Sequence, residues 1–141
     1  MIILDTNVIS EAMAIRPAEQ VMRWIRFAPR DELYTTAITE AEMRYGAARK
    51  SLYKKDRSLE QIVDRIFTVR FADRVLPFDS TAARELPAIL IAMQRDLHSF
   101  SRMDAMIAAI ARAKGASVAT RNTDDFEKSG VPLINPWQAH P

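Results

Sequence analysis

The N-terminal stretch Met1-Ile-Ile-Leu-Asp5-Thr6-Asn7 decides the fold class. Its first four residues form an apolar run that is typical of a strand buried on both faces of a sheet. The next three residues have side chains that cap helices, and we expect a helix to begin near Val8. A strand that leads directly into a helix is the basic unit of an α/β protein.

Short apolar segments alternate with longer segments of helical periodicity along the rest of the chain. Strands separated by helices pair in parallel, and ligands bind beyond the carboxyl ends of such strands. The sequence shows no repeat and no linker, and it predicts one α/β domain over residues 1–141. The other predicted strands are 33–36, 74–78, 117–120 and 131–134, and the predicted helices are 18–27 with Pro17 in its first turn, 38–50, 59–71, a helix capped by Asp79 and Ser80 that Pro87 bends or restarts, and 103–113.

Composition excludes several kinds of chemistry. The chain has no cysteine, which excludes disulfides, thiolate metal sites and cysteine nucleophiles. Its two histidines, His98 and His140, are far apart, so a zinc site of several histidines is not expected. A bound metal would depend on oxygen ligands, which favours Mg²⁺ or Mn²⁺. The net charge is only +2, so attraction of nucleic acid needs local clusters of cations.

The sequence also predicts a cytoplasmic protein with no membrane association. The N-terminus lacks the basic segment of a signal peptide. The longest uncharged stretch, residues 86–94, is too short to span a bilayer.

Three carboxylates occupy positions where a simple fold favours apolar or neutral side chains. Asp5 ends the first strand, Glu42 lies on a helical stripe that we expect to face the core, and Asp104 opens an uncharged run. Burying a carboxylate without a partner costs several kcal/mol or shifts its pKa. Convergence of such acids is what a divalent metal site requires. The other residues of the stripe are Ile38, Ala41, Tyr45 and Gly46.

Each of these acids also has an explanation as a helix cap. Asp5 is a candidate N-cap, and Thr39–Glu42 and Ser101–Asp104 both match a capping box. The two interpretations are compatible, because the first turn of a helix that follows a strand lies at the same edge of the sheet as Asp5.

A fourth polar group follows the predicted strand 117–120. Asn122, Asp124 and Asp125 can each supply oxygen to a cation. The alternative is an Asx turn or the cap of a short helix.

In these motifs the chain resembles the PIN-domain family of metal-dependent ribonucleases, in particular the VapC-like and FitB-like bacterial toxins. The order and spacing of the matching stretches are specific, and the match runs almost end to end. The stretches are 4–9 (LDTNVI), 38–46 (ITEAEMRYG), 104–109 (DAMIAA), 119–122 (ATRN) followed by Asp125-Phe126, and 134–137 (INPW).

The resemblance implies a three-layer α/β/α sandwich with a central parallel β-sheet and Mg²⁺ or Mn²⁺ in an acidic pocket. By matching motifs, Asp5, Glu42 and Asp104 correspond to the three core acids of the family. Relatives differ at the fourth acid, for which we favour Asp125 assisted by Asn122, with Asp124 in solvent. Thr6, Asn7 and Thr120 correspond to residues beside the pocket.

The resemblance further implies an endoribonuclease that cleaves RNA phosphodiester bonds with metal-activated water. It implies the toxin component of a toxin–antitoxin pair. VapC-like toxins form homodimers and are blocked by a cognate antitoxin that wraps the dimer and enters the acidic pocket.

RNA must be held by groups outside the pocket. Arg102 and Arg121 lie beside pocket acids in the sequence and are candidate substrate contacts. A denser basic run either follows the phosphate backbone or is a solvated helix end and loop. Its members are Arg44, Arg49, Lys50, Lys54, Lys55 and Arg57.

Aromatic and sulfur-containing side chains have a simpler interpretation. Trp24 and Phe27 alternate with arginines in a way that suggests base stacking, but their helical spacing favours core or dimer packing. Met103 and Met106 are predicted to lie in the core.

Two other functions fit the sequence less well. One is an inactive module that binds RNA or protein, and the retained acids argue against it. The other is an aspartyl phosphotransfer or phosphatase domain, but Asn7 stands where such a phosphatase needs a second aspartate. A nucleotide-binding enzyme is disfavoured, because the sequence has neither a P-loop nor a Gly-x-Gly-x-x-Gly segment.

Overall fold

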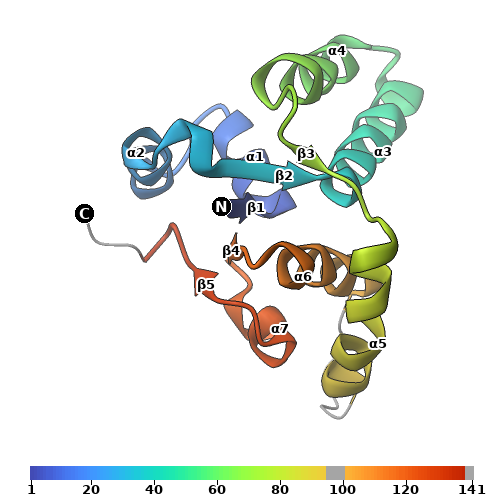
Figure 1. The fold of residues 1–141 in the computed structure, drawn as a ribbon. Helices are drawn as coiled ribbons and strands as arrows, with labels where there is room; N and C mark the ends of the chain where they lie inside the picture. Colours follow the sequence, from blue (N-terminus) through green and yellow to red (C-terminus); the bar gives the residue numbers. More distant parts are fainter. Residues whose placement is uncertain (95–100, 139–141) are drawn as a thin grey trace.

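The computed structural model describes residues 1–94 and 101–138. In this part of the chain, parallel strands form one sheet in the order β3-β2-β1-β4-β5 (Figure 1). The predicted parallel sheet is confirmed, whereas His98 and His140 lie outside the described residues. The strands are β1 (Ile2–Leu4), β2 (Leu33–Thr36), β3 (Val75–Leu76), β4 (Ser117–Ala119) and β5 (Leu133–Ile134).

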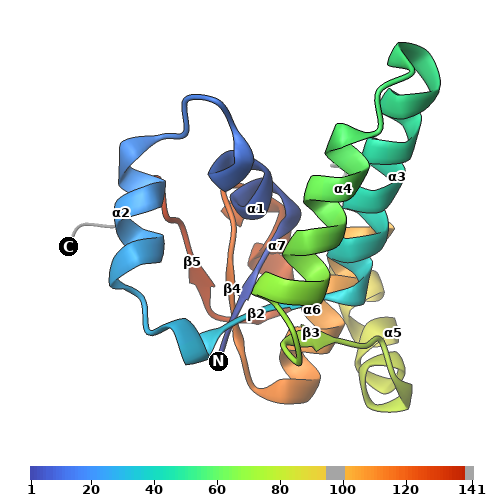
Figure 2. The ribbon, with the colours of Figure 1, turned by 90° about the horizontal axis from the view of Figure 1, so that it is seen from above.

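Helices cover both faces of this sheet and complete the expected α/β/α sandwich (Figures 1 and 2). One layer contains α1 (Thr6–Met13), α2 (Glu19–Phe27), α3 (Ala37–Lys54) and α4 (Ser58–Arg65). The other contains α5 (Ser80–Gln94), α6 (Arg102–Lys114) and α7 (Thr123–Phe126). Short turns of 3₁₀ helix lie at Arg30–Glu32 and Glu127–Ser129, and a π-helical turn lies at Ile66–Arg70.

The sheet separates two hydrophobic cores, because successive side chains of a strand point to opposite faces. Ile3 and Val118 are buried against α5 and α6, and their neighbours Leu4 and Ala119 are buried on the α1–α4 side. This explains why β1 reads as a continuous apolar run. Each fully buried aliphatic side chain contributes roughly 1.5–3 kcal/mol.

The caps of α1 and α3 differ from the sequence-based prediction. Asp5 is the N-cap of α1, so this helix begins at Thr6 instead of near Val8. Helix α3 begins directly after β2, because the Thr36 hydroxyl accepts a hydrogen bond of 3.1 Å from the amide of Thr39. The predicted capping box from Thr39 to Glu42 is therefore wrong, which frees the Glu42 carboxylate for other contacts.

The buried stripe of α3 is also offset from the predicted one. Thr39, Met43 and Ala47 are buried at a spacing of four residues. Glu42 lies at the edge of this stripe and is half-buried. The predicted stripe was wrong at three of its members, because they face away from the sheet on a helix of which only the first half packs on it. Ala41, Tyr45 and Gly46 are exposed.

The segment predicted as one helix over 59–71 divides at Arg65. Beyond this point the π-helical turn Ile66–Arg70 adds a residue to the repeat, and the wider turn carries Val69 out of the core, where it is 65% exposed. Ile62 was also predicted to pack inward and is half-exposed.

Three smaller expectations are corrected as well. Pro17 precedes α2, which begins at Glu19. Helix α5 continues through Pro87 to Gln94, so it does not restart there. Met103 is 44% exposed near the start of α6 and does not belong to the core. No helix in residues 1–94 and 101–138 is long and apolar enough to cross a membrane.

The glycine in α3 gives a prediction about stability. Gly46 lies inside the helix with open space where a Cβ would project, so we expect Gly46→Ala to raise the free energy of unfolding by about 0.5–1 kcal/mol. Urea denaturation measures the change.

Gly115 is the matched control, because it ends α6 with a φ of 63° in the left-handed region. Gly115→Ala should lower stability by about 1 kcal/mol. A Gly46→Ala variant that is less stable than the parent would contradict the position of this residue inside a regular, open helix face.

Candidate active site

Asp5 is held at the carboxyl edge of the sheet by its strand neighbours. The register pairs Leu4 with Ala119, so the residues that follow, Asp5 and Thr120, are adjacent. The Asp5 side chain is only 3% exposed. Its Oδ1 accepts a hydrogen bond of 2.8 Å from the amide of Thr6, and its Oδ2 accepts one of 2.8 Å from the Thr120 hydroxyl. Both carboxylate oxygens are thereby fixed in orientation.

Glu42 reaches the same edge from α3. The Thr6 hydroxyl donates to Glu42 Oε1 at 3.1 Å and lies 3.2 Å from the hydroxyl of Thr39. Thr39 is fully buried beside the cap of α3, and sequence reasoning gave it no place in the site. The available signal was a threonine one turn inside a helix that follows a strand.

Asn7 ties the loop after β4 to α1. Its side-chain amide donates to the Thr120 hydroxyl at 3.3 Å, and its carbonyl oxygen accepts from the amide of Arg121 at 3.3 Å. The amide of Asn122 donates to the Thr120 hydroxyl at 3.0 Å. Thr120 therefore links Asp5, Asn7 and Asn122 in one network.

Asp104 lies in the first turn of α6. The Ser101 hydroxyl caps this helix by accepting hydrogen bonds from the amides of Met103 and Asp104. Burial raises the pKa of Asp104 to about 7, together with the negative charges of Asp5, Glu42 and Asp125. The Asp104 carboxyl is thus within electrostatic reach of acids carried by three other segments.

The other acids show the same mutual effect. Burial raises the pKa of Asp5 against the hydrogen bonds from Thr120 and Thr6, and the charge of Asp125 raises it further. Burial also raises the pKa of Glu42, opposed by the Thr6 hydroxyl, and the charge of Asp5 adds to the rise. Asp124 and Asp125 are both exposed, and only Asp125 is a cause of any of these shifts.

The carboxylate oxygens of Asp5, Glu42 and Asp104 are ligands that suit a hard divalent cation. None of the causes of the three raised pKa values is a cationic side chain of the described residues. Within residues 1–94 and 101–138, no three acidic or histidine side chains form a ready-made cage for a metal ion. A cation held here would therefore relieve repulsion between acids that the protein leaves unbalanced, and would draw their side chains together.

The two arginines predicted as substrate contacts are placed differently. The Arg121 guanidinium lies over the ring of Trp137, 5.3 Å from its centroid. Arg102 is exposed at the start of α6 and forms no ion pair with the acids in the described part of the chain. Neither arginine neutralises the acidic site.

Comparison with known proteins identifies the family. The model of the PIN domain matches residues 2–131. The chain belongs to the PIN-domain family.

This PIN domain is similar to bacterial proteins over nearly its whole length. It is 38% identical over 138 residues to the VapC ribonuclease Y4jK of Sinorhizobium fredii, covering 98% of this chain and 99% of the relative. It is 36% identical over 137 residues to the toxin FitB of Neisseria gonorrhoeae, covering 97% and 99%. The structure of FitAB bound to an IR36 DNA fragment matches with a TM-score of 0.88 and 36% identity, over 100% of this chain and 99% of that chain.

The raised pKa of Asp104 predicts how stability depends on pH. Because the folded protein binds this proton more tightly than the unfolded chain, whose pKa is near 3.8, the free energy of unfolding without metal falls as pH rises from 3.8 to about 7. Asp104→Asn removes this loss. At pH 8 in EDTA the variant should be more stable by roughly 1–2 kcal/mol, since water partly screens the half-exposed carboxyl.

Urea denaturation at pH 5 and pH 8 measures this effect, with Asp124→Asn as the control for loss of a neighbouring exposed acid. The control should keep the wild-type pH dependence. An Asp104→Asn variant whose stability changes with pH as the wild type's does would show that Asp104 is not under repulsion.

Proposed function

We propose that this PIN domain is a metal-dependent endoribonuclease and the toxin of a toxin–antitoxin pair. The observation that carries the proposal is the position of Asp104 at an edge of the sheet, where burial and then the charges of Asp5, Glu42 and Asp125 raise its pKa. The similarity to a VapC ribonuclease and to the toxin FitB supports the same activity.

Asp5, Glu42 and Asp104 are the residues that we assign as ligands of Mg²⁺ or Mn²⁺. When bound, the cation would lower the pKa of the attacking water and neutralise charge on the leaving 3′ oxygen. Oxygen donors without cysteine or histidine suit these metals. The hydrogen bonds of Thr6 and Thr120 hold Asp5 in orientation, so little reorganisation is needed on its side of the pocket.

The other polar side chains of the site have separate roles in the proposed hydrolysis. We assign to Glu42, which the Thr6 hydroxyl orients, the role of binding the cation directly or of orienting the attacking water. The water oxygen forms a bond to phosphorus as the bond from phosphorus to the 3′ oxygen breaks, and the 3′ oxygen takes up a proton. The products carry 5′-phosphate and 3′-hydroxyl ends. Asp125 is the fourth acid, and Asn122 assists it beside Thr120.

The proposal includes a homodimer and an antitoxin partner. On α2, Trp24 packs against the core, whereas Phe27 is 78% exposed. Core packing therefore accounts for the tryptophan alone, and Phe27 is a candidate for the dimer contact. The FitAB structure supports a partner protein of the antitoxin class.

The rival functions gain no support from the site. A phosphatase of the aspartyl type needs a second aspartate at position 7, and Asn7 there is engaged with Thr120 and Arg121. Tight RNA binding without cleavage in both Mg²⁺ and Mn²⁺ would favour the inactive module instead.

The first activity prediction concerns the acids and the metal. Asp5→Asn and Asp104→Asn should each lower cleavage of total RNA by at least about 100-fold, because each removes a charged ligand. EDTA should abolish cleavage, and added Mg²⁺ or Mn²⁺ should restore it. The exposed acid Glu127 provides the control variant, Glu127→Gln, which should cleave at the wild-type rate. Mapping the new ends completes the test, and 2′,3′-cyclic phosphates would rule out this mechanism.

The second activity prediction separates two neighbouring acids. Asp125→Asn should lower the cleavage rate by about tenfold or more, whereas Asp124→Asn should leave it within about twofold. The reason is that only Asp125 acts on the carboxyls of Asp5 and Asp104. The opposite order of the two rates would assign the fourth acid to Asp124.

A further inference from the structure

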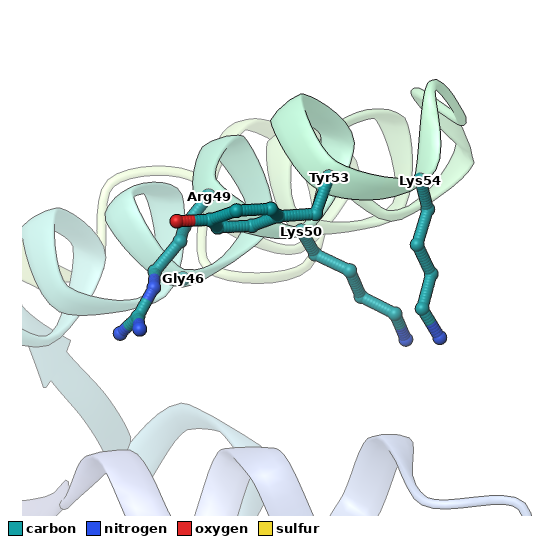
Figure 3. Close-up of a pocket in the computed structure, with 5 residues that line it drawn as sticks. All are labelled: Gly46, Arg49, Lys50, Tyr53 and Lys54. Atoms are coloured by element: carbon teal, nitrogen blue, oxygen red, sulfur yellow. The ribbon is translucent and has the colours of Figure 1, made fainter.

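One exposed face of α3 carries cations and aromatic rings outside the acidic site. We call this surface the α3 strip. Figure 3 shows the charged ends of its cations pointing to the same side of the helix, with the Tyr53 ring lying along the helix and its hydroxyl toward Arg49. The α3 strip consists of Tyr45, Arg49, Lys50, Tyr53 and Lys54.

The α3 strip continues directly from the acidic site. Arg49 and Tyr53 follow Glu42 by seven and eleven residues, which are two and three helical turns, so all three share one face. A groove between α1 and α3 is lined by Thr6, Glu42 and Gly46, and Gly46 also lines the hollow of the α3 strip. Because Gly46 has no side chain, nothing separates the two surfaces.

The cations of the α3 strip are available to a ligand. In residues 1–94 and 101–138, neither Arg49 nor Lys54 forms an ion pair, and Lys50 acts only at a distance by lowering the pKa of Asp56. Arg44, another basic side chain of α3, differs from these, because it forms ion pairs with Glu40 and Asp64. The Arg44 Nε lies 2.8 Å from Glu40, and its Nη1 lies 3.0 Å from Asp64.

This contrast corrects the basic run predicted from the sequence. Arg44 does not belong to it, because its charge is balanced by two acids. Arg57 is 3.6 Å from Glu60 and is likewise paired. The other members of the predicted run form no ion pair in the described part of the chain, and three of them line the hollow beside Tyr53. These members are Arg49, Lys50, Lys54 and Lys55, of which Lys55 does not line the hollow.

The tyrosines distinguish the α3 strip from an ordinary solvated helix. Tyr45 is 68% exposed, and Tyr53 is 74% exposed on the part of α3 that continues beyond the last buried residue, Ala47. Figure 2 shows this end of α3 projecting beyond the sheet. Aromatic faces between cations form the usual surface for single-stranded nucleic acid, where bases stack and phosphates are neutralised. A solvated helix end has no need of two exposed rings.

We propose that the α3 strip binds the single-stranded RNA on one side of the scissile phosphodiester. The inference rests on the proposed ribonuclease function. It adds a binding surface for the RNA that flanks the cleaved phosphodiester. Arg49, Lys50 and Lys54 neutralise phosphates, and Tyr53 stacks on a base. The strand reaches the α3 strip over Gly46, where the absence of a side chain permits close approach of the backbone.

Binding measurements test this assignment in the full chain. We use the Asp104→Asn background in EDTA, so that RNA is not cut, and a fluorescein-labelled RNA of random sequence about 15 nucleotides long. The triple variant Arg49→Gln, Lys50→Gln, Lys54→Gln should bind about tenfold more weakly, and its plot of log K against log salt should be shallower by about two, at roughly 0.7 per lost phosphate contact.

Two controls make the result specific. The variant Arg65→Gln, Arg70→Gln, Arg84→Gln removes the same charge from exposed residues outside the α3 strip, and its affinity and salt slope should change little. Tyr53→Leu should weaken binding by about tenfold, and Tyr53→Phe should restore it, because the ring stacks and the hydroxyl does not. Thermal denaturation of each variant checks that the fold is kept.

The outcomes separate this inference from the function on which it rests. Wild-type affinity and salt slope in the α3-strip triple variant would overturn the inference even if the wild-type chain cleaves RNA. Failure of the wild type to cleave any RNA with Mg²⁺ or Mn²⁺ would overturn the proposed function, and the binding comparison would still decide the inference. If the triple variant loses binding to labelled poly-L-glutamate and keeps its RNA affinity, the α3 strip serves an acidic polypeptide and the inference fails.

Discussion

Removal of carboxylates from water, together with repulsion between them, is the constraint on which the rest of the site depends. Asp5 is almost completely removed from water, and the only polar partners of its carboxylate in the described residues are the Thr120 hydroxyl and the backbone amide of Thr6. Hydrogen bonds of this kind orient a carboxylate and lower its pKa, but in Asp5 burial outweighs them. The ionised carboxylates at this edge of the sheet therefore lower the stability of the folded protein. Binding of a divalent cation is suited to reverse this effect.

The parallel sheet makes this concentration of charge possible. Adjacent parallel strands end at the same edge, so Asp5 after β1 and Thr120 after β4 become neighbours although they are 115 residues apart in the chain. Helices that begin directly after a strand or a capping serine then add Glu42 from the second turn of α3 and Asp104 from the first turn of α6. The apolar cores, one on each face of the sheet, keep the strands in register. Their burial offsets the free energy that the acids at this edge cost the fold.

The sequence predicted the parallel sheet and the grouping of the acids for physical reasons that can be named. An apolar run followed by a carboxylate has few structural explanations, and the glycine after α6 marked the end of that helix. The buried face of α3 was predicted wrongly, because Ala41, Tyr45 and Gly46 repeat at helical spacing yet lie on the side that faces away from the sheet. The buried residues between them are Thr39, Met43 and Ala47. Periodicity reports that residues share a helix face, and it does not report which face meets the core.

Pairing of charges was equally invisible in the sequence. Arg44 and Arg49 belong to one basic run, but the fold places Asp64 of α4 beside Arg44, whereas Arg49 has no ion pair within residues 1–94 and 101–138. The resemblance favours Asp125 as the fourth acid, and the structure adds that its charge raises the pKa values of Asp5 and Asp104.

The projecting half of α3 shows how a small protein can extend a rigid element into water. The last buried residue of α3 is Ala47, and the helix continues for two further turns to Lys54 with no buried side chain in that part. A separate peptide of that length would not stay helical, because forming the first turn is costly, but each turn added to an existing helix costs little. The half of α3 that packs on the sheet acts as the nucleus, and Lys54 offsets the negative end of the helix dipole. The projecting half of α3 is therefore kept helical by the half that packs on the sheet, although it has no hydrophobic core of its own.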